Sequence, residues 1–277
     1  MEIKKNGKSI NVISPTDKIP SGKIPIIFLH GFTGSAEDWL PFFEKLNNKC
    51  FPIAIDLPGH GKTELPNYVN HYMVGSYVDV INTVLDFFDI KKTILLGYSM
   101  GGRVALSFTV AYPEKVIALI LEGATAGIEN EKERETRKKN DAVLIQKLLT
   151  YGIDKFINYW MDLPFFRSLK SLNNKEYDEI IVRKKTNSSE KLANSLLGFG
   201  TGQMPPLWNK LASVKIPVLL LAGSLDTKFV RINKKMNKFI HDSTLMIIED
   251  CGHNTHLENK EKFIILVNNF LKELELK

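Results

Sequence analysis

Short runs of β-branched and other apolar residues alternate along this chain with longer amphipathic stretches. Apolar runs of about four to eight residues are typical of buried strands, and the amphipathic stretches between them indicate helices. Strands that alternate with helices usually build a mostly parallel sheet covered by helices. We therefore predict an α/β fold with strands at 24–29, 51–55, 93–96, 116–121, 218–222 and 245–248.

This alternation stops between residues 126 and 208, where strand-like runs disappear and the sequence becomes charged and helical in pattern. The segment is too long and too structured to be a loop. Inserts that cover the carboxyl ends of parallel strands are places where pockets form. We therefore predict a core made of residues 1–125 and 209–277 and a helical cap at 126–208. The cap contains several aromatic residues, among them Phe156, Tyr159, Trp160, Phe165 and Phe166.

The composition is that of an ordinary globular protein: 277 residues, 44% of them hydrophobic, are enough to bury one sizeable core. No stretch approaches the roughly 18 to 20 consecutive apolar residues of a membrane-spanning helix, and the first residues are polar. We expect no membrane insertion and a cytoplasmic location. The two cysteines, Cys50 and Cys251, lie far apart and predict two reduced thiols.

The charge balance would help to attract an anionic ligand, although such an excess is also common in proteins where it serves only solubility. Basic residues outnumber acidic ones by 37 to 31, a net charge of +6, which would attract an anion. The densest charge run, 129–141, mixes both signs, so it predicts a solvated helix surface and no nucleic-acid interface. No nucleotide fingerprint or metal-ligand cluster is visible, and we predict neither cofactor nor metal.

A candidate nucleophile follows the strand at 93–96. Residues 97–101 read Gly-Tyr-Ser-Met-Gly, a G-x-S-x-G motif, and a helical stretch comes directly after it. A serine on so tight a turn has a strained backbone, and side chains at Gly97 and Gly101 would collide with the neighbouring strand and helix. The turn also places Ser99 at a helix N-terminus, which favours developing negative charge.

The strand at 24–29 leads into His30-Gly31-Phe32-Thr33-Gly34, where a fold of this kind supplies its second oxyanion donor. We expect the backbone N–H groups of Phe32 and Met100 to form the oxyanion hole together. His30 lies at the strand end and is expected to pack the turn, not to act as a base.

Two further residues complete a triad in the chain order serine, acid, histidine. Asp226 follows the strand at 218–222, and His253 follows the strand at 245–248. An imidazole can take the serine proton, and a carboxylate fixes its tautomer and orientation. Glu122, at the end of the strand at 116–121, is the rival acid, and His256 is the rival histidine.

Taken together, these segments resemble one family, the 2-succinyl-6-hydroxy-2,4-cyclohexadiene-1-carboxylate (SHCHC) synthases, α/β-hydrolase-like lyases of menaquinone biosynthesis. Many esterases and C–C bond hydrolases share three of these features: the His-Gly pair at 30–31, the loop at 56–61 and the G-x-S-x-G turn at 97–101. More specific are residues 97–103, Arg137 with Asp141, Trp160 before Pro164, 226–229 and 252–256. The likeness spans nearly the whole chain and implies an α/β-hydrolase fold.

The resemblance implies a lyase that eliminates pyruvate from 2-succinyl-5-enolpyruvyl-6-hydroxy-3-cyclohexene-1-carboxylate to give SHCHC. Ser99, assisted by His253, would remove a ring proton, and no hydrolysis would occur. An oxyanion hole suits this step, because it can stabilise a carboxylate that gains charge as its α-carbon is deprotonated.

Arg103 lies four residues after Ser99, hence on the same helix face, where its planar fork could hold a substrate carboxylate or pair with a core carboxylate. The resemblance adds Arg137 and a second basic cap residue, either Arg183 or Lys184. It also makes Tyr98 and Trp160 pocket walls. Lys228 either reaches the pocket mouth or lies on a surface loop without a binding role. The family's Gln-Pro pair is displaced here, which leaves Gln203 or Met204 as the lining residue.

Three alternatives compete with the lyase. A serine carboxylesterase or C–C bond hydrolase would use the same triad, but an esterase for neutral acyl chains would need an apolar pocket. A catalytically silent binding protein is disfavoured by the intact triad. Haloalkane and epoxide hydrolases are disfavoured because they use an aspartate where this chain has Ser99.

Overall fold

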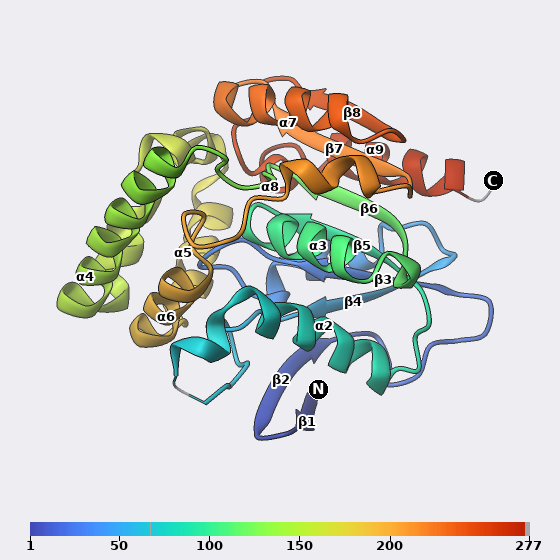
Figure 1. Ribbon diagram of the computed structural model, residues 1–277, viewed down its shortest axis with the longest axis horizontal. Helices are drawn as coiled ribbons and strands as arrows, with labels where there is room; N and C mark the ends of the chain where they lie inside the picture. Colours follow the sequence, from blue (N-terminus) through green and yellow to red (C-terminus); the bar gives the residue numbers. More distant parts are fainter. Residues whose placement is uncertain (67, 275–277) are drawn as a thin grey trace.

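The computed structural model describes residues 1–66 and 68–274. Within these residues eight strands form one sheet in the order β1-β2-β4-β3-β5-β6-β7-β8 (Figure 1). Strands β3 to β8 run parallel to one another, whereas β1–β2 and β2–β4 are antiparallel. The strands span Glu2–Lys5 (β1), Lys8–Ile13 (β2), Ile24–Leu29 (β3), Cys50–Ile55 (β4), Thr93–Tyr98 (β5), Val116–Glu122 (β6), Val218–Gly223 (β7) and Ser243–Ile248 (β8).

The predicted α/β fold is confirmed, and all six predicted strands are present. The strand at 24–29 has the predicted bounds, and each of the other five is one or two residues longer than predicted. The sequence did not predict the hairpin β1–β2. Strand β2 joins the rest of the sheet only through the pairs Val12 with Ile55 and Ile13 with Ala54. The hairpin buries Ile3, Ile10 and Val12 with polar or partly exposed residues between them, so it lacks the continuous apolar run of the central strands.

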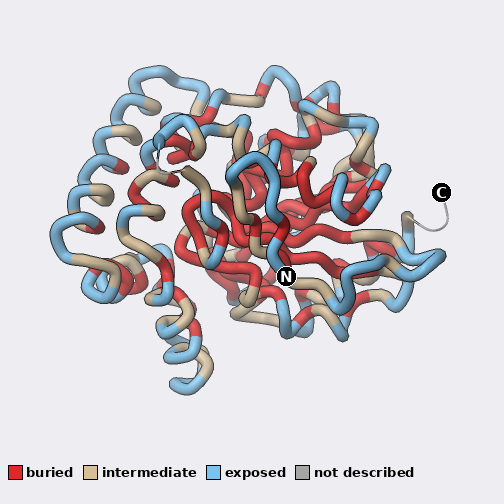
Figure 2. Tube along the Cα trace, turned by 90° about the horizontal axis from the view of Figure 1, so that it is seen from below, coloured by how far each residue is buried: buried red, intermediate tan, exposed pale blue. Residues whose placement is uncertain are grey.

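Side chains of each central strand alternate between two apolar layers. In β3, Ile27 and Leu29 point into the layer that contains helices α2 and α3, whereas Ile26 and Phe28 point into the layer that contains Trp39. The helices of the core are η1 (Ala36–Trp39), α1 (Leu40–Phe43), η2 (Val69–Tyr72), α2 (Val74–Phe87), α3 (Met100–Ala111), η3 (Pro113–Lys115), α7 (Thr227–Phe239), α8 (Thr255–Glu258) and α9 (Lys260–Leu274). Buried residues therefore concentrate along the strands (Figure 2).

The segment between β6 and β7, which the structure describes throughout, contains helices and no strand. These are α4 (Glu131–Met161), η4 (Pro164–Ser171), α5 (Asn174–Lys185), α6 (Ser189–Phe199) and η5 (Trp208–Ser213). Helix α4 is broken at Gly152, whose φ of 74° is left-handed. Helices α4, α5 and α6 lie to one side of the sheet in Figure 1 and share their own apolar cluster, which includes Leu148, Phe156 and Leu192. None of the described helices combines the length and the apolar character that crossing a bilayer would require.

Candidate active site

Ser99 lies on a sharp turn between β5 and α3. Its backbone has φ 50° and ψ −104°, a conformation that L-residues seldom adopt, and its N–H donates to the carbonyl of Glu122 on β6 over 2.8 Å. A Cβ on Gly101 would lie 2.1 Å from the Leu29 carbonyl oxygen, and one on Gly97 would lie 2.4 Å from the Gly101 carbonyl oxygen. The two motif glycines are therefore required by the close approach of strand, turn and helix.

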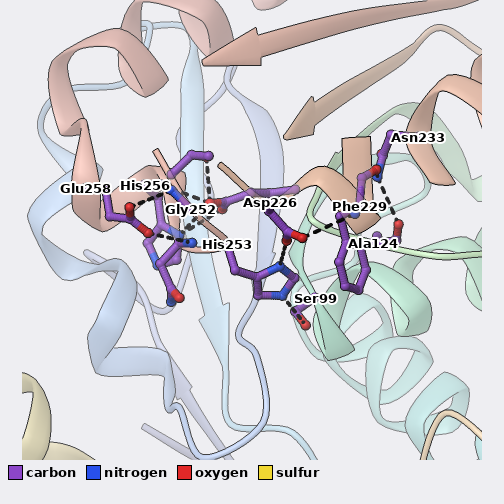
Figure 3. Close-up of polar contacts among 12 residues, drawn as sticks. Ser99, Ala124, Asp226, Phe229, Asn233, Gly252, His253, His256 and Glu258 are labelled. Carbon is purple, nitrogen blue, oxygen red and sulfur yellow. Dashed lines mark hydrogen bonds and ion pairs between the residues drawn. The ribbon is translucent and has the colours of Figure 1, made fainter. Parts of the chain in front are cut away.

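The structure brings Ser99, His253 and Asp226 together, as Figure 3 shows. Nε2 of His253 lies 2.9 Å from Oγ of Ser99, and Nδ1 lies 2.6 Å from Oδ2 of Asp226. The other carboxylate oxygen of Asp226 accepts the N–H of Phe229 at the start of α7 over 3.2 Å. With Nδ1–H donating to the carboxylate, Nε2 is left as an acceptor that faces the serine hydroxyl.

Aromatic rings enclose the imidazole of His253. The ring centroids of Phe165, Phe229 and Tyr98 lie 3.9, 4.6 and 5.3 Å from its own. Burial lowers the pKa of His253 below its ordinary value, and the adjacent Asp226 carboxylate opposes this without reversing it. The imidazole therefore stays neutral at neutral pH, the state in which it can accept a proton.

Two carboxylates, the buried Glu122 and the partly exposed Glu258, hold the loop that carries His253. Glu258 accepts the N–H groups of Gly252 and Asn254 over 2.6 and 3.1 Å. Glu122 accepts the Thr255 hydroxyl over 2.7 Å and the backbone N–H of His256 over 2.9 Å, and it lies 2.8 Å from Nδ1 of the same histidine. The rival acid and the rival histidine therefore pair with each other. The sequence analysis did not identify Glu258, whose only signal is a carboxylate four residues after Asn254 at the start of a helix.

The two expected oxyanion donors are Met100, which follows Ser99 in the chain, and Phe32, in the loop after β3. Met100 is the first residue of α3, so its N–H has no acceptor within the helix. The N–H of Phe32, in the loop after β3, has no acceptor among the residues that the structure describes. This loop packs closely against the ring of Tyr98. A Cβ on Gly31 would lie only 2.5 Å from a carbon atom of that ring.

His30 packs the turn, as expected. Its Nδ1 donates to the carbonyl of Gly31 over 2.8 Å, and its Nε2 accepts the N–H of Leu57 over 3.0 Å. Both ring nitrogens are thus engaged by the backbone, and the side chain is buried.

Arg103 is buried between α3 and α6 with a carbonyl as its partner. Its Nη1 donates to the carbonyl of Phe199, the last residue of α6, over 2.8 Å, and the guanidinium carbon lies 4.6 Å from the centre of the Phe199 ring. The same nitrogen lies 3.6 Å from the sulfur of Met204. Burial lowers the pKa of Arg103 to about 10. No carboxylate in the described part of the chain forms an ion pair with it. Asp141 acts on its charge only from beyond ion-pair distance, and the positive charge of Arg137 opposes that effect.

The three basic residues between positions 126 and 208 that were expected as substrate ligands occupy different environments. Arg137 forms an ion pair with buried Asp141, with Nε 2.8 Å from Oδ1. Lys184 is buried, and its Nζ donates to the Thr33 hydroxyl over 3.2 Å; burial lowers its pKa. Arg183 is partly exposed, and its Nε lies 3.3 Å from Oδ1 of Asp38. Of the two neighbours on α5, Lys184 is therefore the one that faces inward.

The remaining predicted residues differ in exposure. Trp160 packs edge-on against the Phe32 ring at 5.3 Å, and its indole N–H is buried without a hydrogen-bond partner among the described residues. Gln203 is exposed, whereas Met204 is buried against Arg103. Lys228 is exposed, with its Nζ 5.9 Å from the centre of the Phe229 ring.

Nothing in this arrangement suggests a metal centre. In the described residues, no three histidine, cysteine, aspartate or glutamate side chains gather as ligands would. The guanidinium of Arg103 forms no ion pair, and the indole N–H of Trp160 has no hydrogen-bond partner among the described residues; both are hydrogen-bond donors. They suit an anionic organic molecule.

Known proteins share this fold and much of this sequence. The model of the α/β-hydrolase fold family matches residues 24–260. A protein of Bacillus subtilis (strain 168), provisionally named SHCHC synthase, is 36% identical over 93% of this chain and 94% of its own length. The SHCHC synthase of Salmonella heidelberg (strain SL476) is 30% identical over 86% of this chain and 90% of its own length. The solved structure of MenH from S. aureus superposes with a TM-score of 0.89 and 33% identity, covering 96% of this chain and 98% of that one.

The pKa direction of His253 predicts how activity depends on pH. Because a base must be neutral and the pKa of His253 is lowered below 6.5, kcat/KM should persist as pH falls and reach half its plateau only below pH 6.5. Asp226→Asn removes the group that opposes the lowering. The midpoint should then move to still lower pH, and kcat should fall by about 10³- to 10⁴-fold as the tautomer is lost.

The measurement is a pH–rate profile of the wild type and of Asp226→Asn, with Asp154→Asn, an exposed position on α4, as the matched control. An upward shift of the acid limb in Asp226→Asn would show that Asp226 does not act on His253 electrostatically.

The pairing of Glu122 with His256 predicts a large effect on stability. Glu122→Ala would leave the Thr255 hydroxyl and both donors of His256 buried without an acceptor, and breaking a buried pair in this way costs about 3–5 kcal/mol. Urea unfolding of Glu122→Ala and of Glu114→Ala, an exposed control, measures this difference. Equal unfolding midpoints would mean that the pair contributes nothing to the folded state.

Proposed function

The chain belongs to the SHCHC synthase family of α/β hydrolases, and we propose that it eliminates pyruvate from 2-succinyl-5-enolpyruvyl-6-hydroxy-3-cyclohexene-1-carboxylate to give SHCHC, a step of menaquinone biosynthesis. We also propose that Ser99, His253 and Asp226 are its catalytic triad. Residues 126–208 are the helical cap in this proposal, and residues 1–125 and 209–277 are the hydrolase core.

The observation that carries the proposal is the buried charge of Arg103, one helical turn beyond Ser99, which forms no ion pair with a described carboxylate. A charge taken out of water without a counter-ion is costly. Its burial is explained if the counter-ion is a carboxylate of the substrate, held by the planar fork of the guanidinium. An esterase for neutral acyl chains would gain nothing from a buried guanidinium beside its serine, so this charge favours the lyase.

The names of substrate and product define the bonds that change. The substrate has a double bond between C3 and C4, whereas the product has double bonds at C2 and C4. A proton is therefore lost from C2, the new bonds form between C2 and C3 and between C4 and C5, and the C5–oxygen bond to the enolpyruvyl group breaks. The released enol becomes pyruvate by tautomerising. Since C2 bears the succinyl ketone, the oxygen that gains charge is that ketone oxygen, and not a carboxylate as the sequence analysis expected.

The geometry around Ser99 supports each of these steps. His253 accepts the proton of the Ser99 hydroxyl through Nε2, and the serine oxygen removes the proton from C2. Asp226 stabilises the imidazolium that forms, and the imidazolium gives its proton to the departing enolpyruvate oxygen, which restores the neutral base and releases the enol. The N–H groups of Phe32 and Met100 donate to the ketone oxygen as it becomes an enolate. No covalent intermediate is needed, so the serine acts as a proton carrier.

The remaining predicted residues bind the other parts of the substrate in this proposal. Arg103 and Arg137 hold carboxylates, and Lys184 is preferred to Arg183 as the second basic cap residue because it is the buried one. Tyr98 and Trp160 form the pocket walls. Lys228 and Gln203, both exposed, could contact the substrate only at the pocket mouth.

Pyruvate release from the proposed substrate tests the assignment. The wild type should release pyruvate rapidly. Ser99→Ala should reduce kcat by about 10³-fold or more, and Arg103→Lys, which keeps the charge but loses the fork, should reduce kcat/KM by about 10- to 100-fold. Pyruvate is followed by coupling to lactate dehydrogenase.

Arg231→Lys, at an exposed position of α7, is the control for the arginine substitution and should match the wild type. Release no faster than without protein, together with rapid cleavage of simple esters, would leave the triad in place and overturn the lyase assignment.

A further inference from the structure

The residue after Phe32 has a strained backbone. Thr33 has φ 67°, in the left-handed region, and it is fully buried. A β-branched residue rarely adopts this conformation, because its branched side chain crowds the backbone. The Thr33 carbonyl shares a peptide plane with the N–H of Gly34, and this N–H donates to the Gly31 carbonyl over 3.0 Å. The Gly31 carbonyl in turn shares a peptide plane with the N–H of Phe32, so the conformation of Thr33 constrains the direction of that N–H through the turn. Contacts from elsewhere in the fold must hold it there.

Those contacts come from the end of α5 and the turn that follows it. Nδ2 of Asn187 donates to the carbonyl oxygen of Thr33 over 3.0 Å, and Nζ of Lys184 donates to its hydroxyl over 3.2 Å. Oδ1 of Asn187 accepts the N–H of Gly61 over 2.9 Å, and its Nδ2 also donates to the Lys184 carbonyl over 3.1 Å. Asn187 is buried, so one side chain ties together α5, the loop after β3 and the loop at 56–61.

The Phe32 side chain is held from the same part of the chain. Its ring packs edge-on against Trp160 at 5.3 Å and against Phe156 at 6.5 Å, both on α4. The loop at 31–34 therefore has anchors in α4, in α5 and in the turn after α5. The other oxyanion donor, Met100, differs because helix α3 of the core fixes it.

We propose that Asn187 is a positioning residue that fixes the oxyanion hole, by holding Thr33 in its left-handed conformation so that the Phe32 N–H faces the reacting oxygen. The cap thus builds one of the two donors, and it does so with a residue that need not touch the substrate. This inference rests on the proposed function, since it assumes that Phe32 and Met100 stabilise an oxyanion.

Asn187→Ala tests this role through the separation of kcat from substrate binding. The full loss of one oxyanion donor costs about 10²- to 10³-fold in kcat, and a donor that is displaced but present should cost about 10-fold. The dissociation constant of the substrate, measured by calorimetry in the Ser99→Ala background, should change less than 2-fold. Asn158→Ala, an exposed asparagine on α4, is the control and should match the wild type in both quantities.

A double-mutant cycle with Thr33→Gly tests the strain itself. Glycine adopts a positive φ without steric cost, so the loop should depend less on the side chain of Asn187. The roughly 10-fold loss caused by Asn187→Ala should shrink to about 3-fold or less in the Thr33→Gly background. Asn187→Asp serves if Asn187→Ala does not fold. It keeps the acceptor for the Gly61 N–H but cannot donate to the Thr33 carbonyl, and it should lower kcat at least as much.

Labelling of Ser99 by diisopropyl fluorophosphate separates this inference from the proposed function. The serine oxygen forms a bond to phosphorus, fluoride leaves, the proton passes to His253, and the phosphoryl oxygen needs the same two donors. Slower labelling in Asn187→Ala would support the inference even if the wild type released no pyruvate. Unchanged labelling and kcat, or an equal loss in both Thr33 backgrounds, would overturn it while leaving the lyase assignment untouched.

Discussion

The close approach of β5, β3 and α3 around Ser99 is the constraint on which the rest of this site depends. It requires glycine at positions 97 and 101, since any Cβ there would overlap the backbone of the neighbouring elements. It forces Ser99 into a positive φ, with its N–H bonded to the carbonyl of Glu122. The serine side chain therefore has a single direction, toward the end of the sheet where the ends of β7 and β8 present Asp226 and His253. A looser turn would leave the hydroxyl free to point elsewhere, and no arrangement of the base could compensate for that.

Burial is the second organising feature, and it shifts the pKa values of the basic groups in the same direction. It lowers the pKa of His253, of Arg103 and of Lys184, because each positive form is removed from water. For the histidine, the result is a neutral base. Arg103 keeps a pKa of about 10, so it carries a positive charge at neutral pH that no ion pair neutralises. For Lys184, the nearby carboxylate of Asp38 opposes the lowering of the pKa. Buried positive charges of this kind interact more strongly with a bound anion than the same charges would in water.

Most of the fold, and the meeting of Ser99, Asp226 and His253, could be predicted because each depends on local pattern. Central strands are buried on both faces and so are apolar throughout, and Ser99, Asp226 and His253 each follow the end of such a strand. The pairing of Glu122 with His256 could not be predicted, because these residues lie 134 positions apart and either could have served in the triad. Arg183 and Lys184 are adjacent in sequence, and only the packing of α5 shows which one is buried. The role of Asn187 likewise depends on the φ of Thr33, and no sequence pattern marks that angle.

The insertion of residues 123–217 between two paired strands also shapes how this chain must fold. Strand β6 pairs with β5 as soon as both have left the ribosome, but its other edge waits for β7 until the whole helical segment has been synthesised. An open, apolar strand edge is a site of aggregation during that interval. The separate apolar cluster of α4, α5 and α6 gives the inserted segment local contacts of its own. The segment can therefore collapse early, which brings β7 closer to β6 and shortens the time needed for the two strands to pair. A cap that serves the mature site would then also protect the nascent sheet.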